Sequence, residues 1–216
     1  PEVEVTESAA DDEQSVQGPA PNVNQLDGTF EGLINAQLYT FEASEGTAIS
    51  ITMAADEAPD LDSFLALLTL EGVLLASDDE GAGQGVDAAL TDVTVPADGT
   101  YLLLATSRRG ISEPRYLLDN GDLPAPLNYT LTYSGVQNFD LALLDEISLT
   151  SLDLALGTET EITLDADRPV VFMPVAAEAN DALNVITGGE PFAADTVIYV
   201  FDEEGRRIAV QNDTDE

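Results

Sequence analysis

The sequence predicts an all-β protein made of tandem antiparallel β-sandwiches of the jelly-roll or immunoglobulin-like type, with the second sandwich incomplete. Short apolar runs alternate with polar residues at a period of two, as in residues 49–53, which is typical of strands with one buried face. Glycine residues separate these runs at intervals that suit tight turns, and no stretch has the spacing of a long amphipathic helix. A long duplicated pattern, described below, indicates two domains rather than one.

The first group of strands is expected where β-branched, aromatic and aliphatic residues cluster between turn signals. The predicted ranges are 29–33, 37–42, 48–53, 63–70, 73–77, 88–95, 100–106 and 129–133. Gly46, Gly72 and Gly99 lie between these ranges, where turns need a permissive backbone. Residues 64–70 are almost continuously apolar, which predicts a strand covered on both faces. Residues 108–127 hold several proline and glycine residues and are predicted to form a long surface loop.

A second group of strands repeats the earlier order. Its predicted ranges are 158–164, 170–175, 182–187, 196–201 and 207–210. The domain organisation that follows is a flexible acidic arm over 1–25, a first sandwich over 26–135, a linker over 136–145 and a partial second sandwich over 146–216. Within the arm, only Glu2-Val3-Glu4-Val5 alternates enough to form a short strand.

The duplication is clearest in two stretches, 62–80 and 195–213. Each stretch begins with an Asp, continues with an apolar run, reaches a glycine turn ten residues later, and ends with a second apolar run and an acidic cluster. Because the repeat is longer than 100 residues, it indicates duplicated domains rather than a solenoid of short units.

The charge balance limits the partners of the chain. Asp and Glu total 42 against six basic residues, all of them Arg, so the net charge is -36. Such a chain repels phosphate backbones and anionic lipid surfaces, which argues against nucleic-acid and membrane-surface partners and favours cations. No apolar run reaches the roughly 20 residues that a membrane-spanning helix needs. The chain begins at Pro1 without a leader, which is compatible with a secreted or cell-surface protein.

The residue types also exclude most catalytic chemistry. The chain has no His, Cys or Lys, so it cannot form a Ser-His-Asp triad, a Cys-His pair, a Ser-Lys dyad or a Schiff base. Only carboxylate chemistry or a carboxylate-bound metal remains, and most of the Asp and Glu residues fall at turns rather than in a closed apolar pocket. We therefore expect no enzymatic activity.

The acidic clusters could hold a metal ion. If Glu71 and Gly72 close a two-residue hairpin, counting outward places the Asp before the hairpin beside the acidic cluster after it. The candidate ligands are Asp62, Asp78, Asp79 and Glu80 in the first copy, and Asp195, Asn212 and Asp213 in the second. Oxygen ligands of this kind suit Ca²⁺. The alternative is that these residues cap strands and form turns without any metal.

The first half of the chain resembles a known family. The segments that carry the resemblance are Tyr39-Thr-Phe41-Glu-Ala43, Gly46, Ile49-Ser-Ile51, Asp62, Gly72, Ser77-Asp78-Asp79, Pro96-Ala-Asp98-Gly99-Thr100-Tyr101 and Tyr129-Thr-Leu131. In this order and spacing they look like a bacterial pre-peptidase C-terminal domain. The resemblance covers residues 27–135 and is partial over 146–216, where the counterpart of residues 98–101 is missing. It implies a β-sandwich module of secreted peptidases and other extracellular proteins, with calcium bound at loop carboxylates in some members.

Two functions follow as expectations. The first is a non-catalytic extracellular module for structure, adhesion or assembly, whose incomplete second copy is either completed by residues after Glu216 or by the Glu2–Val5 strand of a neighbouring copy in a polymer. The second is an accessory domain that binds a substrate or polysaccharide for a secreted hydrolase such as a peptidase. An exposed aromatic row would favour the second function. The residues in question are Phe41, Phe64, Tyr101, Tyr129 and Tyr133.

Overall fold

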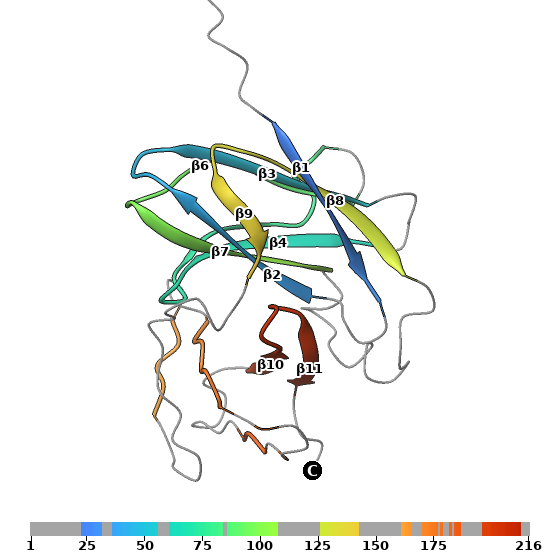
Figure 1. Cartoon of the computed structure of the whole chain (residues 1–216), viewed down its shortest axis with the longest axis vertical. Coiled ribbons are helices and arrows are strands. Elements are labelled where there is room, and N and C mark those ends of the chain that lie inside the picture. Colours follow the sequence, from blue (N-terminus) through green and yellow to red (C-terminus); the bar gives the residue numbers. More distant parts are fainter. Residues whose placement is uncertain are drawn as a thin grey trace, which may run out of the picture.

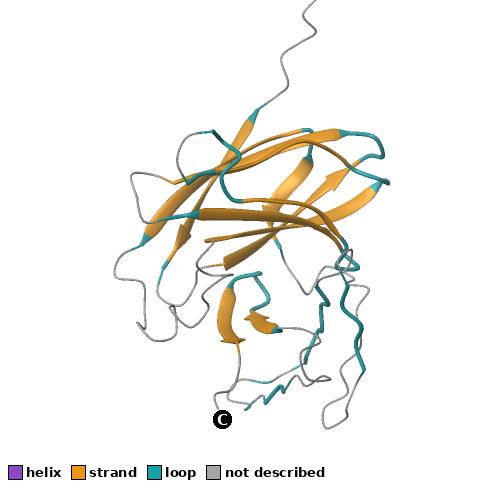
Figure 2. Cartoon of the chain, turned by 180° about the vertical axis from the view of Figure 1, so that it is seen from behind, coloured by secondary structure: helices purple, strands orange, loops and turns teal. Residues whose placement is uncertain are grey.

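The computed structural model describes residues 23–31, 36–55, 61–83, 86–107, 126–142, 161–165, 170–176, 178, 182, 184–186 and 196–212. Every regular element among them is a β-strand, as Figure 2 shows, so the all-β fold class is confirmed. In this part of the chain, no helix is long and apolar enough to cross a membrane.

Two antiparallel sheets face each other and form a sandwich (Figure 1). The first sheet has four strands in the order β1 (Asn24–Phe30), β8 (Leu127–Ser134), β3 (Ala48–Ala55) and β6 (Ala88–Thr94). The second has five strands in the order β5 (Leu74–Asp78), β4 (Ser63–Thr69), β7 (Gly99–Ser107), β2 (Ala36–Ala43) and β9 (Gln137–Leu141). A separate two-stranded sheet pairs β10 (Val197–Phe201) with β11 (Arg207–Asn212).

The core lies between the two large sheets and follows the predicted alternation. In β3, Ile49, Ile51 and Met53 are fully buried, whereas Ser50 and Thr52 between them are half-buried. Every second residue of the facing strands points to the same interior, which excludes water from one continuous apolar cluster. The buried side chains that the five-stranded sheet contributes are Tyr39, Phe41, Ala43, Leu65, Leu67, Tyr101, Leu103 and Ala105.

The five-stranded sheet is covered on its outer face as well. Leu38, Leu68 and Leu102 form a second buried cluster there, and Phe172 and Phe201 from the second half of the chain pack against it. Residues on both faces of β4 are therefore buried, which explains why its sequence is almost continuously apolar. Figure 1 shows β10 and β11 next to one end of β2, where Gln37 forms a β-bridge with Arg206.

A tight connection fixes the β2–β3 turn to the chain before β7. The Asp98 carboxylate accepts a hydrogen bond from the Glu45 backbone at 2.8 Å, and Gly46 and Val95 are joined by a backbone hydrogen bond of 3.0 Å. The Tyr101 hydroxyl donates to the Ala97 carbonyl at 2.6 Å, which closes the same loop from the other side. These contacts give a structural role to the Asp98-Gly-Thr-Tyr101 segment on which the family resemblance rests.

The first strand begins earlier than predicted. Residues 24–30 pair with β8 along their whole length, whereas a strand over 29–33 and an arm reaching residue 25 were expected. The strand is polar because it is the edge of its sheet, where side chains remain partly in water and no apolar alternation is required.

The predicted linker over 136–145 is wrong for residues 137–141, which form β9 and pair with β2 at the edge of the five-stranded sheet. Phe139 stacks on Tyr133 with ring centroids 4.2 Å apart and on Tyr39 at 5.5 Å. In the sequence, only Phe139 and Leu141 mark an apolar alternation, so the signal for a strand was short. The pairing of β9 with β2 is also irregular, between Thr40 and Glu42.

Among its described residues, the second half has fewer strands than predicted. Strands β10 and β11 match the predicted ranges 196–201 and 207–210, but residues 161–164 and 170–175 are not in strands. An apolar segment becomes a strand only where a neighbouring strand can pair with its backbone. The segment around Phe172 instead packs its side chain on the outer face of the sandwich. The arm, most of the predicted loop over 108–127 and much of 182–187 lie outside the described residues.

Candidate functional site

The two stretches that carry the sequence repeat fold into two hairpins with the same pairing. In β4–β5, the register is Leu67 with Ala76 and then Leu68 with Leu74, so one residue is bulged between these pairs. In β10–β11, the register is Val200 with Ala209 and then Phe201 with Arg207, with the same bulge. Each pair in the second hairpin lies 133 residues after its counterpart in the first.

The two turns are also alike in detail. Gly72 and Gly205 have φ values of 81° and 70°, a left-handed conformation that favours glycine. Thr69 and its counterpart Asp202 each receive a backbone hydrogen bond from the turn glycine at 3.0 Å. Their side-chain oxygens accept a second bond from the backbone four residues on, at 3.3 Å in the first hairpin and 2.8 Å in the second. The observed turn is thus one residue longer than the predicted two-residue turn. Beyond the bulge, the two strands pair in the predicted register.

The acidic end of the first hairpin is built around Asp78 as a turn former. Its Oδ2 atom accepts hydrogen bonds from the Gly81 backbone at 2.6 Å and the Ala89 backbone at 2.8 Å. Asp62 lies at the same end of the sheet, and its Oδ1 atom is buried without a hydrogen-bond partner. Glu80 is exposed. The arrangement around Asp78 matches the turn interpretation, because this carboxylate oxygen is already saturated by two N–H groups.

A metal site needs several oxygen ligands in one place. Within the described ranges, no three acidic side chains are grouped so that they could hold a metal ion, and this includes Asp62, Asp78, Asp79 and Glu80. Asn212 lies opposite Val197 in the hairpin register. Asp195 and Asp213 are outside the described residues. Calcium binding stays a prediction for both copies.

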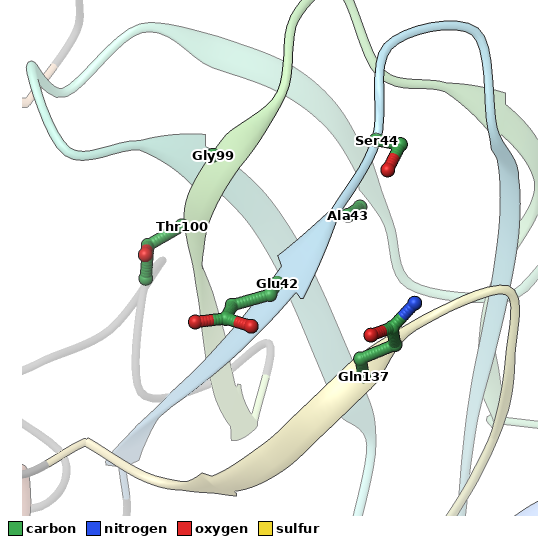
Figure 3. A pocket seen from close by; sticks show the side chains of 6 residues that line it. All are labelled: Glu42, Ala43, Ser44, Gly99, Thr100 and Gln137. Atoms are coloured by element: carbon green, nitrogen blue, oxygen red, sulfur yellow. The ribbon is translucent and has the colours of Figure 1, made fainter.

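A hollow of about 220 Å³ lies at the ends of β2, β7 and β9 (Figure 3). Its lining residues are Glu42, Ala43, Ser44, Gly99, Thr100 and Gln137. Glu42 is the only carboxylate in this lining, and its Oε2 atom accepts a hydrogen bond from the Asn138 amide at 2.8 Å. A carboxylate-pair hydrolase requires two such groups flanking the scissile bond, so this hollow does not have the residues for that chemistry.

Four of the five aromatic residues lie in the core or pack against it. Phe41, Tyr101 and Tyr129 are at most 4% exposed, and Tyr133 and Phe64 are half-buried. Tyr133 packs against the core and stacks on Phe139. A row of rings that binds sugars must present its faces to solvent, so these side chains do not form the platform that a polysaccharide-binding function would need.

Arg206 and Arg207, at the start of β11, have very different surroundings. Arg206 forms ion pairs with Asp202 at 3.0 Å and Glu204 at 2.9 Å, and these two carboxylates raise its pKa. Arg207 is 2% exposed, and its Nε and Nη1 atoms have no hydrogen-bond partner. Burial lowers the pKa of Arg207 to about 10, and its Cζ lies 5.7 Å from the centre of the Tyr199 ring. The signal in the sequence was a charged residue inside the repeated apolar pattern.

Comparison with known proteins bears on the first half of the chain. No curated protein is significantly similar to the chain. Among solved structures, the chain is similar to the pre-peptidase C-terminal domain of a collagenase from Bacillus anthracis, with 17% identity and a TM-score of 0.37. The similarity covers 51% of this chain and 88% of that domain. A family model, that of the bacterial pre-peptidase C-terminal domain, matches residues 35–107, which hold strands β2 to β7. The match of this family model to residues 35–107 confirms the resemblance that the sequence predicted.

Proposed function

We propose that the chain is a non-catalytic structural module of an extracellular protein, and that its second half is a further sandwich completed by a strand from a neighbouring chain. Domains of this family are non-catalytic and are associated with secreted peptidases. The observation that carries the proposal is the β10–β11 hairpin. It repeats the β4–β5 hairpin in register and turn, yet within the described residues it pairs in a sheet of two strands, whereas β4–β5 lies in a sheet of five.

The apolar face of the second hairpin supports the need for a partner. In the first hairpin, Leu65 and Leu67 are buried in the sandwich core and Leu75 packs against it. Their counterparts 133 residues later are Ile198, Val200 and Ile208. Ile208 is 49% exposed, and Ile198 and Val200 are half-buried. Removing apolar surface from water stabilises a protein by roughly 25 cal/mol per Å², so an added strand that covers this face would be favoured.

The shape and chemistry of the described surface support a role without catalysis. The lining of the hollow at Glu42 has one carboxylate, and the chain has no His, Cys or Lys to serve as nucleophile or to activate a hydroxyl group. The acidic surface, with a net charge of -36, keeps copies soluble until a specific contact overcomes their repulsion.

The test is the mass of the full chain in solution as its concentration and salt are raised. We expect species larger than the 22.8 kDa monomer in analytical ultracentrifugation, with the larger species favoured at high salt because salt screens the repulsion between copies. A mass of 22.8 kDa at every concentration and salt would rule out completion by a neighbouring chain.

A further inference from the structure

The outer face of the four-stranded sheet belongs to neither of the two buried apolar clusters. The first cluster fills the space between the sheets. The second lies on the outer face of the five-stranded sheet, where residues of the second half pack. Figure 1 shows β10 and β11 on that side of the sandwich, with β1, β3, β6 and β8 on the opposite side. Among the described residues, the outward side chains of the four-stranded sheet are all half-buried or exposed.

The two central strands of this sheet present no charged side chain on that face. Side chains alternate along a strand, so the residues between those of the core point outward. Two nearby carboxylates, Asp27 and Asp92, lie on the edge strands β1 and β6. On a chain with 42 Asp and Glu residues, this uncharged area is a distinct surface, and we call it the hydroxyl face. Its residues on β8 and β3 are Asn128, Thr130, Thr132, Ser134, Ser50, Thr52 and Ala54.

Hydrogen bonds between β1 and β8 hold several side chains of the hydroxyl face in place. Three pairs of directly opposite residues in the register are joined in this way. Less side-chain entropy is lost when a partner binds to groups that are already ordered. The pairs are Thr29 donating to Asn128 at 2.9 Å, Thr130 donating to Asp27 at 3.0 Å and Gln25 donating to Thr132 at 3.3 Å.

The hydroxyl face keeps hydrogen-bonding groups for a partner. Within the described part of the chain, the Asn128 amide nitrogen and the Thr132 hydroxyl proton have no acceptor. Thr52 is opposite Thr132 in the register, and its hydroxyl group has no hydrogen bond to a described residue. A hydroxyl group can both donate and accept. Because neighbouring strands lie about 4.8 Å apart, one extended partner can reach several of these groups at once.

This chemistry favours a neutral partner that is rich in hydroxyl groups. The net charge of -36 repels an anionic polymer, and a cationic one is attracted to the carboxylates elsewhere on the chain. An apolar partner would leave the hydroxyl and amide groups without hydrogen bonds, which is costly. A neutral polysaccharide offers donors and acceptors to these groups, and its binding does not require a charge to be removed from water.

We propose that the hydroxyl face binds a neutral polysaccharide, which lies across β8 and β3 and forms hydrogen bonds with Asn128, Thr132 and Thr52. This function goes beyond the proposed structural role. It belongs to the first sandwich, so it does not depend on association through the second half. The contacts are hydrogen bonds rather than ring stacking, so each one is weak, and a long polymer that holds several copies binds them more tightly.

The experiment measures binding of the full chain to insoluble cellulose, chitin, xylan and mannan, by sedimenting the polymer and measuring the protein left in solution. We expect binding to at least one of these neutral polymers and none to the anionic polymer polygalacturonate. The affinity should be the same in about 0.1 M and about 1 M NaCl, because no ion pair is formed. If none of the four neutral polymers binds, or if the affinity falls steeply with salt, the proposal is wrong.

The variant T52V/T132V locates the binding surface. Valine keeps the size and branching of threonine and removes only the hydroxyl groups. We expect the double variant to bind about tenfold or more weakly, since each lost hydrogen bond costs about two- to tenfold. T100V is the matched control, because Thr100 lies on the five-stranded sheet at the hollow near Glu42, and it should bind like wild type.

Urea midpoints of the three forms show whether each variant is folded. If folded T52V/T132V binds like wild type, or if T100V loses as much affinity as the double variant, the hydroxyl face is not the binding surface. The sedimentation of the chain without polymer, which tests the proposed function, should be the same for all three forms. Failure of either test therefore leaves the other unaffected.

Discussion

Two tyrosines and a glutamine place a hydrogen-bonded cluster inside an apolar core. The hydroxyl groups of Tyr39 and Tyr129 are 2.6 Å apart, and both are within hydrogen-bonding reach of the side-chain oxygen Oε1 of Gln37. The side-chain amide of Gln37 donates to the Thr29 backbone carbonyl at 3.3 Å, so the cluster links β2 to β1 of the facing sheet. Burial raises the pKa of Tyr39 to about 12, and it raises the pKa of Tyr129 well above its usual value. The cluster therefore stabilises the sandwich only while both phenols are neutral.

This pKa shift predicts loss of stability at alkaline pH. Between pH 10.0 and about 12, folded Tyr39 keeps its proton while the unfolded chain releases it, so the free energy of unfolding falls as pH rises through this range. Tyr39→Phe has no proton to release in either state, so its urea midpoint should fall less steeply with pH. Phe30→Leu, which changes a ring packed on Tyr129 but no titratable group, is the control and should keep the wild-type slope. Equal slopes for wild type and Tyr39→Phe would contradict the prediction.

A substitution at Asp78 distinguishes the two interpretations of the acidic cluster, as metal ligands or as turn formers. As a turn former it accepts two backbone hydrogen bonds, so Asp78→Ala should lower the free energy of unfolding by about 2 kcal/mol. The loss should be the same in calcium and in a chelator, because the bonds involve no ion. Glu80→Ala is the control at an exposed neighbouring position and should cost little. A loss seen only when calcium is present would make Asp78 a metal ligand instead.

At the scale of elements, the turn of each hairpin is a point of contact with another part of the chain. A Cβ atom on Gly72 would lie 2.0 Å from the Val170 carbonyl oxygen. A Cβ atom on Gly205 would lie 2.9 Å from the Ala142 carbonyl oxygen and 3.0 Å from that of Leu38. Both turns thus combine a left-handed backbone with close approach of another backbone, and glycine satisfies both requirements at once.

These contacts can be separated by substitution. Gly72→Ala should destabilise the protein by the strain of a left-handed alanine, about 1 kcal/mol, plus the cost of displacing the chain around Val170. Gly46→Ala is the control, because Gly46 has a similar φ of 77° and no atom within 4 Å of the added Cβ. The difference between the two urea midpoints measures the contact with residue 170. If both variants lose the same stability, the second half of the chain does not pack against this turn.

The elements that were predictable from the sequence are those whose side chains decide their position. Strand β4 followed from an apolar run that needs cover on both faces, and β3 followed from the strict alternation of Ile49, Ile51 and Met53. The edge strands β1 and β9 were misplaced or missed, since one side of an edge strand remains in water and weakens the alternation. The hairpin bulge was not predictable, because it arises from pairing geometry rather than from residue type.

The candidate site, too, was predictable from the sequence only in part. The sequence placed Asp62 and Asp78 at one sheet end, because register follows from counting along a hairpin. It did not show that the Asp78 carboxylate accepts hydrogen bonds from the backbone of Gly81 and Ala89, since those contacts come from the loop after β5 and from β6. Arg207 was missed as a special residue because its burial depends on distant segments, and its one local signal is a charge inside the repeated apolar pattern.

At the scale of the whole molecule, the net charge of -36 must be held in a small volume. Repulsion between carboxylates opposes folding, and monovalent salt screens it with a Debye length of about 3 Å at 1 M. We therefore expect the melting temperature to rise steadily with NaCl concentration. Calcium at the same ionic strength should give the same rise if it acts only by screening. A further rise at micromolar calcium would show a specific site, for which the acidic clusters of both copies are the candidates.

The short backbone connection between Leu38 and Gly205 determines how the molecule would respond to a mechanical load. Among the described residues, the hairpin contacts the sandwich through this 2.7 Å hydrogen bond, the bridge between Gln37 and Arg206 and the apolar contacts of Phe201, rather than through a continuous ladder. Strand β2, by contrast, is held by full pairing with β7 on one side and partial pairing with β9 on the other. We therefore expect a pull applied at β11 to detach the hairpin at a lower force than the one that unfolds the sandwich.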